Sequence, residues 1–137
     1  MNRIVLAALV WVLPLSVHAA EKKAKEPGSV KNGLLADQKG MTLYFTAKDA
    51  PNSGKSTCNG PCAEMWPPFA APADAAATGS WTVVTRDDGS KQWAYSGMPV
   101  YRWKNDKKPG DTTGDNVGNV WHTIKVSKKQ AAKAKSK

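Results

Sequence analysis

One ten-residue phrase occurs twice in this chain, at residues 40–49 (GMTLYFTAKD) and 97–106 (GMPVYRWKND). The two copies share a Gly, a Tyr and an Asp at a constant offset of 57 residues: Gly40 with Gly97, Tyr44 with Tyr101, and Asp49 with Asp106. Self-similarity at a fixed spacing indicates a supersecondary unit that is used more than once and buries its apolar face against its neighbour. We therefore predict one small domain made of two similar halves, at about residues 33–68 and 81–124.

Short runs of β-favouring residues, separated by turn residues, fill both halves. In the second half WTVVTR and KQWAYS flank the turn sequence DDG, and in the first half GLLAD and MTLYF flank QKG. Such pairs are typical of β-hairpins, and no window has the 3.6-residue period of a long amphipathic helix. The expected fold is mainly β: a small single domain of two pseudo-repeated antiparallel β-hairpin units with long turn-rich loops.

The first residues have the pattern of a secretory signal peptide. Arg3 precedes the apolar run IVLAALVWVLPLSV, and the small-residue exit VHAA follows it. The run is shorter than the roughly 20 residues that a membrane-spanning helix needs, and Pro14 interrupts it. We predict a signal peptide at residues 1–19, cleaved after Ala19. The mature protein is then periplasmic or secreted and has no membrane anchor.

The formal net charge of +9 is concentrated outside the predicted domain. Between Val30 and Ile124 the chain has 10 basic and 9 acidic residues, so the folded part is close to neutral. Segments with this lysine-rich composition cannot bury enough apolar surface to offset the entropy of ordering. We predict a mobile basic leader at 20–29, the β domain at 30–126 and a disordered Lys/Ala-rich tail at 127–137. The basic segments should attract anionic surfaces weakly and bind no specific nucleic acid.

The two cysteines of the chain, Cys58 and Cys62, lie in the sequence CNGPC. In an exported protein such a pair is expected to form a disulfide, which would stabilise the fold by about 2 kcal/mol on a chain-entropy estimate. The alternative is a copper or thiol-redox site that His122 completes, with Met65 or Met98 as a soft ligand. The first reading needs no cofactor, whereas the second needs copper or a redox partner.

The repeated residues are read first as architecture. Gly40 and Gly97 allow a tight turn before each strand, Tyr44 and Tyr101 place a ring in the core, and Asp49 and Asp106 accept backbone N–H groups and close the following loop. The second copy has Trp103 where the first has Thr46. Trp103 is therefore expected to serve something particular to the second half.

These residues resemble a known family, the bacterial secreted-repeat proteins, which are predicted lipoproteins with a Yx(F/W/Y)xxD motif. YRWKND at 101–106 fits the motif fully, and YFTAKD at 44–49 keeps its Tyr and Asp. The similarity extends through CNGPCAEMWPP, DDGSKQWAYSGMPVY and GDTTGDNVGNVWH, from about residue 33 to residue 122. The cysteine that would carry a lipid is absent here. The resemblance implies a secreted repeat domain and no established activity.

No serine-nucleophile motif or catalytic pair is recognisable, so we predict no catalytic residues and no enzyme activity. The expected function is that of an exported, non-catalytic binding or structural module of unknown ligand. The alternative is a periplasmic copper or thiol-redox accessory protein that uses the CNGPC cysteines and His122.

Overall fold

The computed structural model describes residues 25–135, and the predicted signal peptide lies outside them. Its elements are seven short strands, two short α-helices and a 3₁₀ turn: β1 Gly28–Lys31, β2 Leu34–Asp37, β3 Tyr44–Thr46, α1 Pro61–Met65, β4 Trp81–Thr85, β5 Lys91–Tyr95, β6 Met98–Pro99, η1 Val117–Asn119, β7 Trp121–Thr123 and α2 Lys128–Lys135. The mainly β fold that we predicted is therefore confirmed. Among these residues, no helix is long and apolar enough to cross a bilayer.

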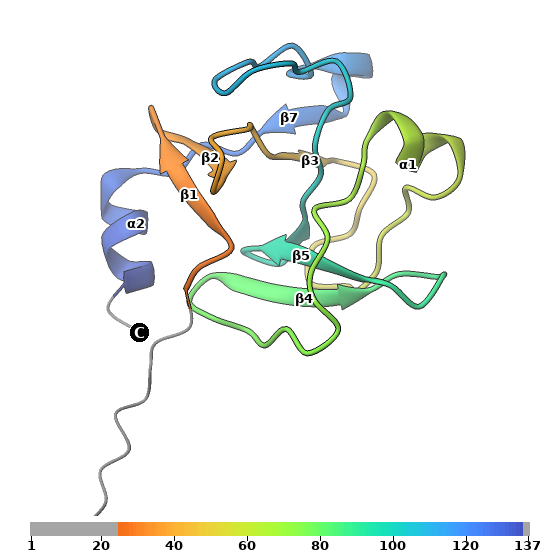
Figure 1. The fold of residues 1–137 in the computed structure, drawn as a ribbon, viewed down its shortest axis with the longest axis horizontal. Helices are drawn as coiled ribbons and strands as arrows, with labels where there is room; N and C mark the ends of the chain where they lie inside the picture. Colours follow the sequence, from red (N-terminus) through yellow and green to blue (C-terminus); the bar gives the residue numbers. More distant parts are fainter. Residues whose placement is uncertain (1–24, 136–137) are drawn as a thin grey trace, which may run out of the picture.

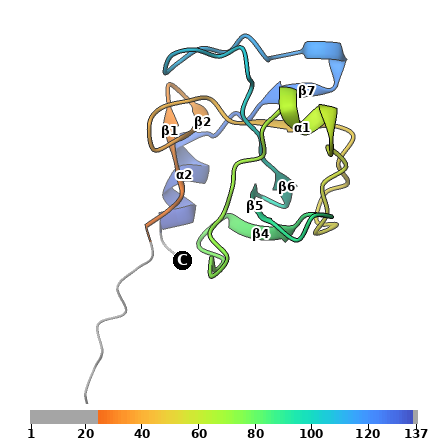
Figure 2. The same cartoon turned by 45° about the vertical axis from the view of Figure 1, so that its right-hand side comes forward.

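The strands form three small antiparallel sheets, β1–β2, β3–β7 and β4–β5–β6 (Figure 1; β6 is labelled in Figure 2). The β4–β5 hairpin is the one that WTVVTR and KQWAYS predict, with Val83 opposite Trp93. The β3–β7 pair joins the two halves of the sequence, because Phe45 lies opposite His122. Sequence alone indicates hairpins within each half, and a pair that links strands this far apart carries no local signal.

The first hairpin begins earlier than we predicted. β1 pairs with β2 through a turn at Asn32 and Gly33, whose φ angles are 50° and 78°. An Asn-Gly pair with positive φ at both residues is the preferred two-residue hairpin turn. Gly28 and Ser29, which we assigned to the mobile leader, are therefore part of a strand. The hairpin expected around QKG is also present, but in a shorter form, as a bridge between Ala36 and Thr42.

The C-terminal segment also differs from the prediction. We expected residues 127–137 to be a disordered tail, whereas the structure has helix α2 over Lys128–Lys135. Ser127 and Gln130 form a reciprocal capping box, in which Gln130 N donates to Ser127 Oγ (3.2 Å) and Ser127 N donates to Gln130 Oε1 (2.9 Å). Such a cap starts a helix, and Ala131 then packs on the core. Figure 2 shows α2 beside the β1–β2 hairpin.

The interior has two clusters of buried side chains. The larger contains Leu35, Leu43, Phe69, Trp81, Trp93, Tyr95, Val100 and Val126. The smaller contains Tyr44, Cys58, Trp66, Tyr101 and Trp121. Both clusters draw residues from both halves, so neither half encloses a core by itself.

Candidate functional site at the junction of the two halves

The repeated tyrosines lie next to each other at the centre of the molecule. Tyr44 N donates to Tyr101 O and Tyr101 N donates to Tyr44 O, each over 2.9 Å. Both side chains are fully buried, and each ring meets a Trp edge to face, Trp66 for Tyr44 and Trp121 for Tyr101. The two copies of the motif are therefore related by an approximate two-fold axis that passes between these residues.

Each tyrosine hydroxyl binds the aspartate of the other copy. Tyr44 Oη donates to Asp106 Oδ2 over 2.6 Å, and Tyr101 Oη donates to Asp49 Oδ2 over 2.6 Å. Both aspartates are buried, and a buried carboxylate is tolerated only when its oxygens are hydrogen-bonded. The sequence predicts a core role for the tyrosines and a loop-closing role for the aspartates, and the structure adds a hydrogen bond that joins them between copies.

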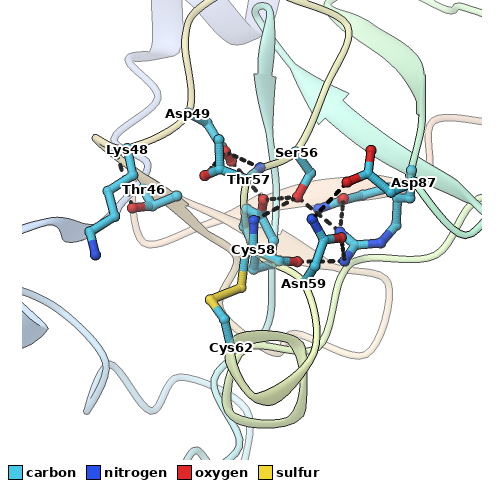
Figure 3. The surroundings of a disulfide bond; sticks show 12 residues. Thr46, Lys48, Asp49, Ser56, Thr57, Cys58, Asn59, Cys62 and Asp87 are labelled. Atoms are coloured by element: carbon cyan, nitrogen blue, oxygen red, sulfur yellow. Dashed lines mark hydrogen bonds between the residues drawn. A yellow bond between two sulfur atoms is a disulfide. The ribbon is translucent and has the colours of Figure 1, made fainter.

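The second oxygen of each carboxylate closes the loop that follows it. Asp49 Oδ1 accepts from Thr57 N (2.8 Å) and Thr57 Oγ1 (2.7 Å). Asp106 Oδ1 accepts from Thr113 N (3.0 Å) and Thr113 Oγ1 (2.6 Å). Figure 3 shows Asp49 directed at Thr57. Each aspartate thus fixes its own loop with one oxygen and anchors the other half with the second.

The repeated glycines also contact the opposite half of the molecule. Gly40 and Gly97 have φ of 87° and 84°, a backbone region in which L side chains are strained. Gly97 O accepts from Asn52 N of the first half (2.9 Å), and Gly40 O accepts from Gly110 N of the second half (3.2 Å). A Cβ on Gly97 would collide with the Asn52 side chain. All three residue types that recur in both copies therefore contact the opposite half.

Burial raises the pKa of Tyr44 and of Tyr101 well above the ordinary tyrosine value, and the hydrogen bonds to Asp106 and Asp49 raise them further. Loss of the phenol proton would leave a phenolate beside a carboxylate in a water-excluded site. Burial also raises the pKa of Tyr95, the third tyrosine. None of the three is poised to titrate near neutral pH.

This arrangement predicts alkaline unfolding. Because the tyrosine pKa values are raised in the folded state, the stability that they contribute is complete below the unfolded-state value of about 10 and falls as pH rises above it, by about 1.4 kcal/mol per pH unit for each tyrosine. Tyrosinate absorbance should therefore appear together with loss of near-ultraviolet circular dichroism. Ionisation of all three phenols at a pH near 10, with the native dichroism retained, would contradict the assignment.

Arg86 is a buried charged residue that the sequence pattern does not reveal. Its guanidinium is buried, and Nη1 donates to Ser56 Oγ (2.9 Å) and Gln92 Oε1 (2.7 Å). Nη2 donates to Cys58 O (2.5 Å) and Asn59 Oδ1 (3.2 Å). Arg86 follows a β-strand and precedes the turn DDG, which is a common place for an exposed arginine, so no local pattern reveals its burial.

Ser56 connects this arginine to the central tyrosine pair. Ser56 Oγ lies 2.5 Å from Tyr101 Oη, which in turn binds Asp49. A polar chain therefore runs from Arg86 through Ser56 and Tyr101 to Asp49. The other copy has no such chain, because Tyr44 Oη accepts from the backbone N of Gly114 (3.3 Å) instead.

Trp103 packs against Trp66 in a stack of tryptophan rings. It stacks on Trp66 (ring centroids 4.1 Å apart), and Trp66 stacks on Trp121 (3.9 Å). Gly114 lies against two of these rings, since a Cβ there would come within 2.8 Å of Trp66 and 2.9 Å of Trp103. At the corresponding place in the first copy, Thr46 is buried opposite Trp121. Trp103 therefore completes a stack of three rings with Trp66 of the first half and Trp121 of the second, and Thr46 has no ring with which to do the same.

Cys58 and Cys62 form a disulfide in the structure (Figure 3). Pro61 begins helix α1, which places Cys62 in the first turn and brings its sulfur back to Cys58. Cys58 is buried in the smaller cluster, and Cys62 packs at its edge. The CNGPC loop is thus held at Cys58 by both the disulfide and Arg86.

The candidate copper ligands come from different elements, except that Cys62 and Met65 both belong to α1. The two sulfur atoms are bonded to each other, while His122 lies in β7 with its ring 5.7 Å from that of Phe45. Met65 is exposed in α1, and Met98 pairs with Tyr95 in the third sheet. Across residues 25–135, no three His, Cys, Asp or Glu side chains are grouped so that they could hold a metal ion.

Comparison with known proteins gives one match. The model of a family described as a secreted repeat of unknown function matches the chain twice, at residues 29–70 and 82–125. These segments agree closely with the two halves that the sequence repeat delimits. No curated protein and no solved structure matches the chain.

Proposed function

Because the chain belongs to this family of secreted repeats of unknown function, we propose that it is an exported, non-catalytic binding or structural module that works in the periplasm. It needs no cofactor for folding, and its terminal lysines add a weak attraction to anionic surfaces. One observation supports the proposal: the repeated tyrosines and aspartates, Arg86 and the two cysteines are engaged in bonds that hold the fold together.

The aspartates at the centre of the molecule are hydrogen-bonded through every carboxylate oxygen. Both Asp49 carboxylate oxygens and both Asp106 oxygens accept hydrogen bonds from the protein. Both terminal nitrogens of Arg86 donate to neutral acceptors, and the cysteine sulfurs are joined. A general base or nucleophile must present a lone pair to a substrate, and the two aspartates are buried among their partners.

The proposal predicts the thiol and metal content of the native protein. Protein purified anaerobically from the periplasm should give no reaction with a thiol reagent in denaturant, and two thiols per chain after reduction. It should carry no stoichiometric copper, and Cys58→Ser combined with Cys62→Ser should lower stability by about 2 kcal/mol without changing metal content. Two free thiols in the native protein, or copper that this double variant loses, would establish the copper or thiol-redox alternative instead.

A further inference from the structure

A cavity of about 250 Å³ lies between the β1–β2 hairpin, the β4–β5 hairpin and helix α2. None of the repeated tyrosines and aspartates of the candidate site lines it. It is lined by Glu26, Gly28, Ser29, Val30, Leu35, Trp81, Tyr95 and Ala131. In Figure 1 helix α2 lies beside β1. A fully apolar cavity of about 150 Å³ already holds benzene, so this one has room for a single ring with a short side chain.

The edge of the cavity is built by specific contacts of β1. Gly28 lies so close to the indole of Trp81 that a Cβ would come within 2.5 Å of Cζ2. Gln38 Nε2 donates to Glu26 O (2.7 Å) and Gly28 O (3.1 Å), which fixes the chain just before β1. These contacts hold Glu26 at the rim.

Helix α2 covers the cavity with a small side chain. The capping box at Ser127 and Gln130 fixes where the helix begins, and Ala131 is the α2 residue that lines the cavity. A larger apolar residue at this position would fill the space. The volume therefore exists because the covering residue is an alanine.

The lining combines apolar walls with one free charge. Leu35, Trp81 and Tyr95 are buried and form the walls, while Ser29 Oγ already donates to Asp37 O (3.2 Å). Within residues 25–135, the Glu26 carboxylate makes no hydrogen bond or ion pair. Its charge reaches the cavity, since it adds to the raised pKa of Tyr95, of which burial is the main cause.

We propose that this cavity binds a small organic amine, with its ring or compact apolar body against the Trp81 and Tyr95 side of the lining and its ammonium group at Glu26. Aromatic faces and a carboxylate both favour a cation, and the apolar walls favour the body attached to it. This assignment rests on the binding role proposed above and names its ligand class.

The test uses the mature chain, residues 20–137, and three probes of the same shape: phenethylamine, phenethyl alcohol and phenylacetate. Binding is measured by calorimetry and by tryptophan fluorescence. The amine should bind saturably and about tenfold more tightly than the alcohol, because an ionised partner roughly doubles the strength of a hydrogen bond. Phenylacetate should bind most weakly, since its carboxylate meets Glu26.

Two kinds of variant locate the site. Ala131→Leu fills the cavity from the helix, and Val30→Trp covers it from the exposed side of β1; each should weaken amine binding at least tenfold while the melting temperature is kept. Ala132→Leu, at an exposed position one residue further along α2, is the matched control and should bind normally. Glu26→Gln should lower amine affinity to that of the alcohol, whereas Glu64→Gln on α1 should not.

Absence of saturable binding for all three probes would overturn the proposal, as would binding that survives both Ala131→Leu and Val30→Trp. Equal affinity for amine and alcohol, unaffected by Glu26→Gln, would overturn the assigned ligand class. None of these results bears on the thiol and metal measurements, so failure of the cavity assignment is distinguishable from failure of the proposed function.

Discussion

Replacing Asp49 or Asp106 with alanine should destabilise the protein by about 3–5 kcal/mol, the range expected when a buried, hydrogen-bonded charge is removed from its partners. Asp106→Ala leaves the buried Tyr44 hydroxyl without its acceptor and the Thr113 N–H and hydroxyl without theirs. It also creates a cavity at the contact between halves. Urea denaturation followed by tryptophan fluorescence measures the change.

Asp88→Ala is the matched control for these variants. Asp88 Oδ1 accepts from Ser90 N and Ser90 Oγ, the same pair of donor groups that Asp49 Oδ1 has in Thr57. Asp88 is exposed, however, so water replaces the lost partner. The denaturation midpoint of this variant should stay close to that of the wild type.

Double-mutant cycles distinguish pairing between copies from pairing within a copy. Tyr44→Phe should couple with Asp106→Ala by more than about 1 kcal/mol, and with Asp49→Ala by much less, because only the first pair is bonded. The reciprocal cycle, Tyr101→Phe with Asp49→Ala, should also show strong coupling. Coupling of Tyr44 with Asp49 instead would refute the crossed arrangement.

The sequence repeat predicts the unit of this fold better than it predicts the connections between units. Gly40 and Asp49 act on neighbouring turns and loops, and local chemistry is enough to predict such roles. The β4–β5 hairpin and the Cys58–Cys62 disulfide also lie within short segments. A contact such as Tyr44 with Asp106 spans 62 residues, and nothing near either residue specifies its partner.

The differences at the two ends of the domain have a different cause. The Asn32-Gly33 pair is typical of a hairpin turn and favours a strand before it, but the lysine-rich composition of the preceding residues favours a mobile leader. At the other end, the Ser127 and Gln130 cap starts a helix in a segment whose average composition predicts disorder. In both places a single local interaction outweighs composition, because the neighbouring core supplies a surface to pack against.

Arg86 was missed because burial, rather than sequence pattern, gives it its role. Two effects change the free energy of unfolding in opposite directions. The buried guanidinium loses its hydration, which lowers stability, and four acceptors each gain a charge-assisted hydrogen bond, which raises it. Ser56 and Gln92 are buried and have no access to water if the donor is removed, whereas Asn59 is exposed. The bonds to Ser56 and Gln92 should therefore decide the balance.

Arg86→Met should accordingly lower the free energy of unfolding by about 2–4 kcal/mol. Because Arg86 Nη2 also holds Cys58 O, the variant should let dithiothreitol reduce the Cys58–Cys62 disulfide faster. Lys91→Met, which removes a cation bonded to Thr85 at the surface, is the control and should change stability by less than about 0.5 kcal/mol.

A second substitution tests whether orphaned acceptors are the reason for that loss. Replacing both partners of a buried hydrogen bond with apolar groups of similar shape is far less costly than replacing one. Gln92→Met also removes the bond from Gln92 Nε2 to Val100 O (2.8 Å), so Arg86→Met combined with Gln92→Met should be more stable than the sum of the two single losses predicts, by about 1 kcal/mol. If the double variant is instead less stable by the full sum of two independent losses, the Arg86–Gln92 bond does not contribute to the stability of the fold. The polar chain from Arg86 to Asp49 would then be a consequence of the fold and not one of its causes.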